Sequence, residues 1–194
     1  MDTITVVVVV VVVAVAAALV AFLLAKRRSS SQLQQRFGPE YERTVDETGD
    51  RRAAEKDLKQ REKRRSQFEV RPLSSSAANR YRDDWNDIQR GFVDEPGSAV
   101  ERADRLVIQM MRDSGYPVDE FELRADDISV DHPDVSQNYR DAHRVAVAQA
   151  QGQADTEQLR QAVTSYRRLV DALLENRGAA DEGRASGTTD TEEQ

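Results

Sequence analysis

The first 25 positions of the chain are almost entirely apolar, and polar positions begin abruptly after them. Ile4 to Ala25 is an unbroken run of 22 residues without a charge, in which Val6 to Val13 are consecutive valines. As a helix the run is about 33 Å long, which exceeds a hydrocarbon core of about 30 Å. A lone segment in lipid must satisfy its own backbone hydrogen bonds, so it has to be helical although valine favours strands in water. The pattern therefore predicts a single transmembrane helix.

The residues that flank this run predict its orientation. Lys26, Arg27 and Arg28 follow it directly, whereas Asp2 is the only charged side chain before it. By the positive-inside rule we expect a short N-terminus outside the cell membrane and a cytoplasmic C-terminal domain. The three cations also predict contact with anionic headgroups. A cleaved signal peptide is the alternative, but it requires a basic start and an apolar core of about 7 to 15 residues, which fits this chain poorly.

Residues 26–72 are mostly polar. Ser29 to Ser31 is interpreted as a short polar hinge, and Gly38-Pro39 as a break after which Pro39 begins a helix. Asp50 to Phe68 is rich in Ala, Glu, Lys, Leu, Gln and Arg, which predicts a helix. The apolar stripe of that helix is thin, so we interpret it as a charged spacer next to the membrane.

From Leu73 onward, large apolar residues recur at helical spacing. Ser74 to Ser76 can cap a first helix, Pro96-Gly97 marks the start of a second, and Gly115 with Pro117 ends it. The expected inward faces are Ala77, Tyr81, Trp85, Ile88 and Phe92 in the first helix, and Ala99, Ala103, Leu106, Val107, Met110 and Met111 in the second. The aromatic stripe of the first helix could instead bind a partner, but a small domain needs its few aromatic residues in the core.

Further helices are expected before the apolar positions run out. Asp119 to Ile128 is predicted as a shorter helix with Phe121 and Ile128 inward, and Ser129 to Pro133 as a linker. The later inward faces are Val135, Tyr139, Ala142, Ala146 and Val147, ended by Gly152, and then Leu159, Ala162, Val163, Tyr166, Leu169, Val170, Leu173 and Leu174. Gly178 to Gln194 is small, polar and acidic, which predicts disorder.

No strand pattern of useful length is present, so the predicted fold class is all-α. The expected parts are a transmembrane anchor (1–25), a basic, charged juxtamembrane linker and helix (26–72), a four- or five-helix domain (73–177) and a disordered acidic tail (178–194). The formal charge of −7 divides into −1, +5 for residues 26–72, and −11 beyond them. The chain has no cysteine, which excludes disulfides and thiolate metal sites.

Several strings are distinctive: RFGPEYERTV, GDRRAAEKDL, RPLSSSAANRY, GYPVDEFELRADDISVDHP and NYRDAH. On these strings the chain resembles a family of small bacterial membrane-anchored proteins with no assigned function. The resemblance covers most of residues 33 to 175, and VDHP is its most distinctive part. It implies a bacterial origin and one coherent domain, but it assigns no catalytic or binding residue.

Two histidines are the candidates for chemistry. Asp131-His132-Pro133 lies near Asp126, Asp127 and Asp134, and carboxylates with an imidazole are ligands for divalent cations. The spacing matches neither an EF-hand nor a zinc site, so we favour a turn braced by Asp131. His143 could serve as a base with Ser136, Asp141 or Tyr139 nearby in sequence, but a helix-surface histidine is the simpler interpretation.

The run Arg51 to Arg65 contains eight basic and three acidic residues. Arg52, Lys56, Lys59 and Lys63 share a helical stripe that could contact phosphates of nucleic acid or lipid. Phe68 is the only aromatic residue close by that could stack on bases, and the acidic domain would repel a polyanion. We therefore favour a solvated helix held by pairs of opposite charge, and we expect no specific nucleic-acid binding.

The chain contains no G-x-S-x-G, no phosphate-binding glycine loop, no H-E-x-x-H and no dinucleotide fingerprint. We accordingly assign no catalytic, cofactor-binding or metal-binding residue and expect no cofactor. The expected function is non-enzymatic: a membrane-tethered interaction module, a scaffold or adaptor, for an unknown cytoplasmic protein. The alternatives are a membrane-anchored nucleic-acid-binding protein that uses residues 51–65, and a hydrolase or metal site around His132 or His143.

Overall fold

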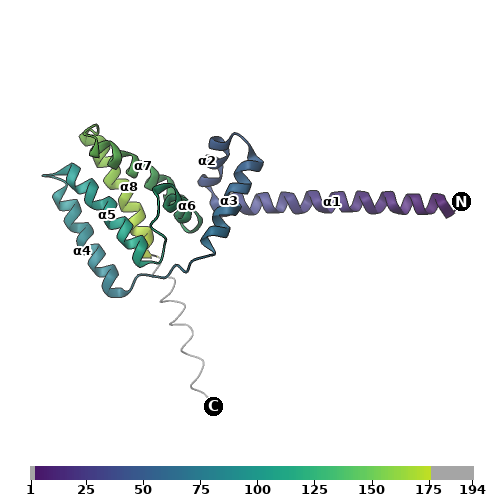
Figure 1. Ribbon diagram of the computed structural model, residues 1–194, viewed down its shortest axis with the longest axis horizontal. Coiled ribbons are helices and arrows are strands. Elements are labelled where there is room, and N and C mark those ends of the chain that lie inside the picture. Colours follow the sequence, from purple (N-terminus) through teal and green to yellow (C-terminus); the bar gives the residue numbers. More distant parts are fainter. Residues whose placement is uncertain (1–2, 176–194) are drawn as a thin grey trace, which may run out of the picture. The chain divides into compact units, whose positions relative to one another are not determined.

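The computed structural model describes residues 3–175; within the first helix the side chains at 3–11, 15, 18 and 22–26 lie outside the described part. All regular elements of the described chain are α-helices, which confirms the all-α prediction (Figure 1). They are α1 (Thr3–Phe37), α2 (Pro39–Thr48), α3 (Arg51–Arg65), α4 (Ser75–Gly91), α5 (Pro96–Asp113), α6 (Phe121–Asp131), α7 (Pro133–Ala150) and α8 (Thr156–Glu175).

The chain divides into two compact units. The N-terminal unit ends at Leu58 and the C-terminal unit begins at Lys59, so the division falls within α3. The sequence pattern instead placed the start of the folded domain at Leu73, where the large apolar residues begin. The difference arises because Arg61, Arg64 and Arg65 pair with α6, and Phe68 and Val70 pack against the core. Hydrophobic patterning does not detect the ion pairs, and two apolar residues are too few to give a helical stripe.

In the N-terminal unit, the predicted hinge at Ser29 to Ser31 is wrong. These serines are helical, and α1 continues without interruption to Phe37. Leu33 and Phe37 are buried, and the Ser30 hydroxyl is hydrogen-bonded to the Glu55 carboxylate, so tertiary contacts hold the serine segment in the helix. Serine lowers helix propensity only modestly compared with glycine or proline.

The predicted break at Gly38-Pro39 is confirmed. Gly38 has φ 46°, a conformation that favours glycine, and Pro39 is in the first turn of α2. α2 packs on α1 beyond this turn, where Tyr41 is buried. Glu40 and Thr44 on the same helix are also buried; Arg43 pairs with Glu40, and the Thr44 hydroxyl donates to the Glu40 carbonyl.

The C-terminal unit contains the main core, which helices α4 to α8 surround. α8 packs against α5 and α7, α4 packs against α5, and α6 packs against α7 (Figure 1). In the described chain five helices follow residue 73, in agreement with the predicted four- or five-helix domain. Trp85 is 5% exposed and belongs to the core cluster, so the core interpretation of the aromatic stripe is confirmed and the partner-face alternative is wrong.

Helix ends in the C-terminal unit follow the local sequence signals. The Ser74 hydroxyl accepts from the backbone N–H of Ala77, which caps α4 as predicted. Asp155 and Gln158 form a reciprocal pair at the start of α8, each side chain accepting from the other residue's backbone N–H at 2.8 Å. The cap at Ser74 explains why the start of α4 could be placed from the sequence.

Two predictions within this unit are wrong. Ser129 to Asp131 are not a linker: they complete α6, and only His132 separates α6 from α7. Ser129 and Val130 are buried there, which favours continuing the helix. Val147, expected inward, is 45% exposed, because the core-facing side of α7 continues through Val145 and Ala146 and Val147 lies beside it.

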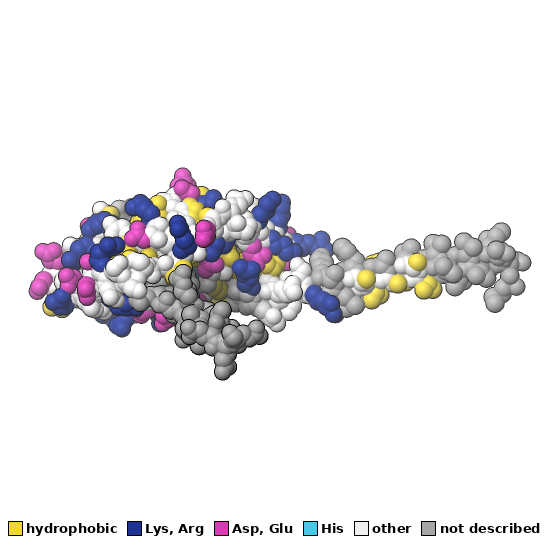
Figure 2. Space-filling model, turned by 90° about the horizontal axis from the view of Figure 1, so that it is seen from below, with side chains coloured by type: hydrophobic (Ala, Val, Ile, Leu, Met, Phe, Trp, Pro, Cys, Tyr) yellow, Lys and Arg dark blue, Asp and Glu magenta, His cyan; other side chains and the backbone are white. Residues whose placement is uncertain are grey.

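Within the side chains that the structure describes, no helix is long and apolar enough to cross a membrane. Much of the run Ile4 to Ala25, on which the transmembrane prediction rests, has side chains outside that described part. Its described large side chains, Val12, Val13, Leu19 and Val20, are each more than half exposed, and apolar side chains line this helix in Figure 2. The predicted disordered tail, Gly178 to Gln194, also lies outside the described residues.

Candidate functional site

Arginines from the second half of α3 pair with the acidic residues of α6. Arg61 lies 2.8 Å from Asp126, and Arg64 binds both carboxylate oxygens of Asp127 at 3.0 and 3.2 Å. Asp127 is fully buried, and its burial raises the pKa of its carboxyl although Arg64 opposes the shift. The contact thus places one cation directly against a carboxylate that has no access to solvent.

Another arginine of α3 contacts the end of α6. Arg65 pairs with Asp131, which also accepts a hydrogen bond of 2.6 Å from the Tyr116 hydroxyl. The Arg65 guanidinium lies 5.2 Å from the centre of the Phe68 ring and 5.8 Å from that of Tyr116. Such cation–π contacts add to the ion pair, so this arginine is held on several sides.

These contacts disfavour the metal hypothesis for His132. Asp126, Asp127 and Asp131 each accept from an arginine instead of converging on one point, and the described residues contain no group of three or more acidic or histidine side chains suited to a metal ion. His132 is half-buried between α6 and α7, and burial lowers the pKa of its imidazole. Asp134 begins α7 and is exposed. Asp131 instead ties the end of α6 to Arg65 and Tyr116.

The basic run therefore has two sets of cations. Arg61, Arg64 and Arg65 are turned toward α6, whereas Arg52, Lys56, Lys59 and Lys63 are exposed. The sequence alone favoured pairs of opposite charge along the helix, and Arg51 with Glu55 forms such a pair. Arg61, Arg64 and Arg65 also pair with residues more than 50 positions later.

His143 on α7 contacts Asp104 and Phe121. Its Nδ1 lies 3.3 Å from an Asp104 carboxylate oxygen, and its ring stacks on Phe121 with centroids 3.7 Å apart. The Tyr166 hydroxyl donates to the same Asp104 oxygen at 2.7 Å. Burial alone would raise the pKa of the Asp104 carboxyl, but the hydrogen bonds from His143 and Tyr166 hold that pKa below its usual value.

Among the described residues, neither Ser136 nor Asp141 is hydrogen-bonded to His143. Ser136 donates to the Pro133 carbonyl, and Asp141 accepts from Gln137 and pairs with Arg144, so neither forms the triad that the sequence left open. Asp104, the actual partner, was missed because it is 39 positions away. A shallow hollow of about 260 Å³ beside His143 is lined by α5 and α7.

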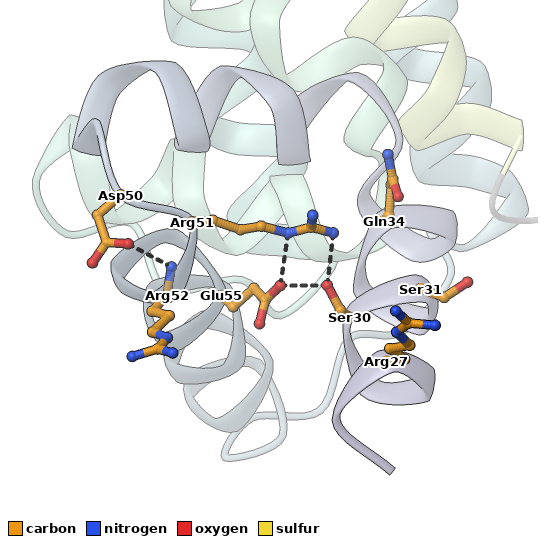
Figure 3. A pocket seen from close by; sticks show the side chains of 8 residues that line it. All are labelled: Arg27, Ser30, Ser31, Gln34, Asp50, Arg51, Arg52 and Glu55. Atoms are coloured by element: carbon orange, nitrogen blue, oxygen red, sulfur yellow. Dashed lines mark hydrogen bonds and ion pairs between the residues drawn. The ribbon is translucent and has the colours of Figure 1, made fainter. Parts of the chain in front are cut away.

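A larger hollow, of about 460 Å³, lies in the N-terminal unit between α1 and the start of α3; we name it the α1–α3 pocket. Figure 3 shows α1 on one side and the start of α3 on the other, with the Arg51 side chain reaching toward Ser30. The residues that line it are Arg27, Ser30, Ser31, Gln34, Asp50, Arg51, Arg52 and Glu55. Of these residues, the sequence indicated Arg27 as a headgroup contact and Arg52 as part of a stripe that could contact phosphates.

Hydrogen bonds hold the Arg51 and Glu55 side chains of the α1–α3 pocket in place. Arg51 donates to the Ser30 hydroxyl at 2.9 Å and to the Tyr41 hydroxyl at 2.8 Å, and it pairs with Glu55 at 3.3 Å. Glu55 also accepts from Ser30 and Tyr41; burial would raise the pKa of its carboxyl, but these three donors lower it. Glu55 is therefore ionised at neutral pH and neutralised by Arg51.

No protein-family model, curated protein or solved structure matches this chain. A functional assignment therefore depends on its own residues and their contacts.

Proposed function

We propose that the protein is a membrane-tethered interaction module: α1 anchors the chain through Ile4 to Ala25, and the helical C-terminal unit binds a protein in the cytoplasm. The proposal includes the orientation expected from Lys26, Arg27 and Arg28, and the bacterial origin implied by the family resemblance. The uncharged run and the basic residues that end it support the anchor.

The observation that carries the proposal is the continuity of α1. The helix extends 12 residues beyond Ala25, as far as Phe37, and its last turns are held by buried Leu33 and Phe37. A flexible linker would let α2 and α3 move away from the anchor. A continuous helix instead fixes the distance from the end of the apolar run to the first buried contacts.

Membrane anchoring is tested by an alkaline carbonate wash of membranes that contain the full-length chain. We expect the protein to stay in the membrane fraction, because burial of the apolar run does not depend on charge. A matched variant with Val8, Val11 and Val15 changed to Arg should appear in the wash. Release of the unaltered chain would overturn the anchor.

The interaction is tested by photo-crosslinking in intact membranes. Val93 and Val147 are the most exposed large apolar residues described in the C-terminal unit, at 83% and 45%, so a photoreactive side chain there leaves the core intact. We expect one protein species to crosslink at either position and not at exposed Gln161 on α8. Equal labelling of many proteins at all three positions would argue against a specific partner.

A further inference from the structure

We propose that the α1–α3 pocket binds the phosphate of an anionic phospholipid headgroup. The proposal rests on the proposed membrane anchor and adds a ligand to it. Three arginines and two carboxylates line the pocket, which leaves it with one excess positive charge. A phosphodiester is the anion that membrane lipids present at this level, and guanidinium groups are well suited to bind it.

The groups in the pocket without partners are donors. Both carboxylates already accept hydrogen bonds: Glu55 from Arg51, and Asp50 from the backbone N–H of Arg52 at 3.0 Å. In contrast, the side chains of Arg27, Ser31 and Arg52 have no partner among the described residues. An incoming phosphate would therefore meet two guanidinium groups and a hydroxyl whose donors are not already used.

The depth of the pocket fits the headgroup layer. Arg27 and Ser31 are two and six residues beyond Ala25 on the continuous α1, which places them about 3 to 9 Å past the apolar run. The polar layer on each side of the hydrocarbon core is about 5 to 8 Å thick. When α1 crosses the hydrocarbon core, Arg27 and Ser31 therefore lie in the layer that contains the lipid phosphates.

Arg51 is a positioning residue in this arrangement. Its guanidinium is occupied by Ser30, Tyr41 and Glu55, and these contacts join the start of α3 to α1 and α2. Arg27 and Arg52, at the two sides of the pocket in Figure 3, are the residues expected to touch the lipid.

The test uses the full-length chain in a neutral detergent, so that it does not depend on insertion into a bilayer. Short-chain phosphatidylglycerol is titrated and bound lipid is counted by native mass spectrometry. Short-chain phosphatidylcholine and inorganic phosphate are titrated in parallel. We expect Arg27→Gln with Arg52→Gln to weaken phosphatidylglycerol binding by about 10- to 30-fold, from about 1 kcal/mol for each basic residue near the headgroup.

Lys59→Gln with Lys63→Gln is the matched control, because it removes the same charge from exposed positions outside the pocket. It should change affinity less than twofold, and Arg27→Lys with Arg52→Lys should retain most of the binding. Equal losses in the two glutamine variants would overturn the pocket in favour of diffuse attraction. Inorganic phosphate bound as tightly as the lipid would overturn the lipid assignment. Failure of the carbonate test would remove the anchor without altering these titrations.

Discussion

At the scale of single residues, Asp127 is the most consequential charge in the C-terminal unit. It is fully buried, and Arg64 supplies both of its charged hydrogen bonds. Removing one partner of a buried pair leaves an uncompensated charge, which costs far more than the pair itself contributes.

We predict that Arg64→Gln lowers the free energy of unfolding by about 3 kcal/mol at pH 7. The loss should shrink as the pH falls into the carboxyl range, because burial raises the Asp127 pKa and protonation removes the buried charge. Urea unfolding followed by fluorescence of Trp85, the single tryptophan, measures both values. Arg90→Gln, at an exposed surface pair, should cost less than about 1 kcal/mol and serves as the control.

The pKa of the Asp104 carboxyl is shifted in the opposite direction from that of Asp127. Its pKa in the folded state lies below the ordinary value, so its charge stabilises the fold above the ordinary carboxyl pKa and that contribution is lost as pH falls through the depressed value. We predict that Asp104→Asn costs about 1 to 2 kcal/mol at pH 7. The difference from the unaltered protein should close in strong acid. An undiminished difference there would show that hydrogen-bond geometry, and not charge, is responsible.

At the scale of elements, the second half of α3 is part of the C-terminal fold. Arg61, Arg64 and Arg65 contact α6, and Phe68 with Val70 packs against the core cluster. We still expect residues 73–177 to fold alone as a helical unit, since they contain the core stripes.

We predict that a fragment of residues 59–177 melts at least about 10 °C above a fragment of residues 73–177. The longer fragment retains contacts that raise its free energy of unfolding by several kcal/mol. About 1 kcal/mol shifts the midpoint of a small domain by about 4 to 8 °C. Circular dichroism at 222 nm gives both midpoints. The variant Arg61→Gln with Arg64→Gln and Arg65→Gln in the longer fragment should remove most of the gain. Identical midpoints for the two fragments would contradict the structural role of this segment.

At the scale of the whole molecule, the distribution of charge bears on nucleic acid. The chain carries −7, and three cations of its basic run are engaged by α6. Acidic and basic side chains are interspersed over the folded part of the chain in the view of Figure 2. Such a surface gives little long-range attraction for a polyanion once salt screens charges beyond about 8 Å.

We predict no specific binding of duplex DNA by a fragment that begins at Ser29, and weak binding that disappears between low and physiological salt as counterion release predicts. Fluorescence anisotropy with labelled duplex at the two salt concentrations measures this, with anionic vesicles titrated in parallel. Sub-micromolar DNA affinity at physiological salt, abolished by neutralising Arg52, Lys56, Lys59 and Lys63, would make the exposed stripe a nucleic-acid site.

The sequence by itself determined the helical class, the inward faces of α4, α5 and α8, and several helix ends. Apolar periodicity, Pro39 and the cap at Ser74 are local signals, because the interactions behind them act within a few turns of one helix. The core position of Trp85 followed from the same periodicity. The uncharged run Ile4 to Ala25 is a local signal of the same kind, and the membrane anchor inferred from it remains a prediction.

Only the tertiary structure decided which charges meet. The pairs of Arg64 with Asp127 and of His143 with Asp104 join residues 63 and 39 positions apart, and nothing in the local pattern selects those partners. The same is true of Ser29 to Ser31, whose helical state is supported by contacts with α3, and of the α1–α3 pocket that those contacts enclose. Ion pairs and hydrogen bonds depend on distance in space, so they become defined only when packing of the apolar faces has brought the helices together.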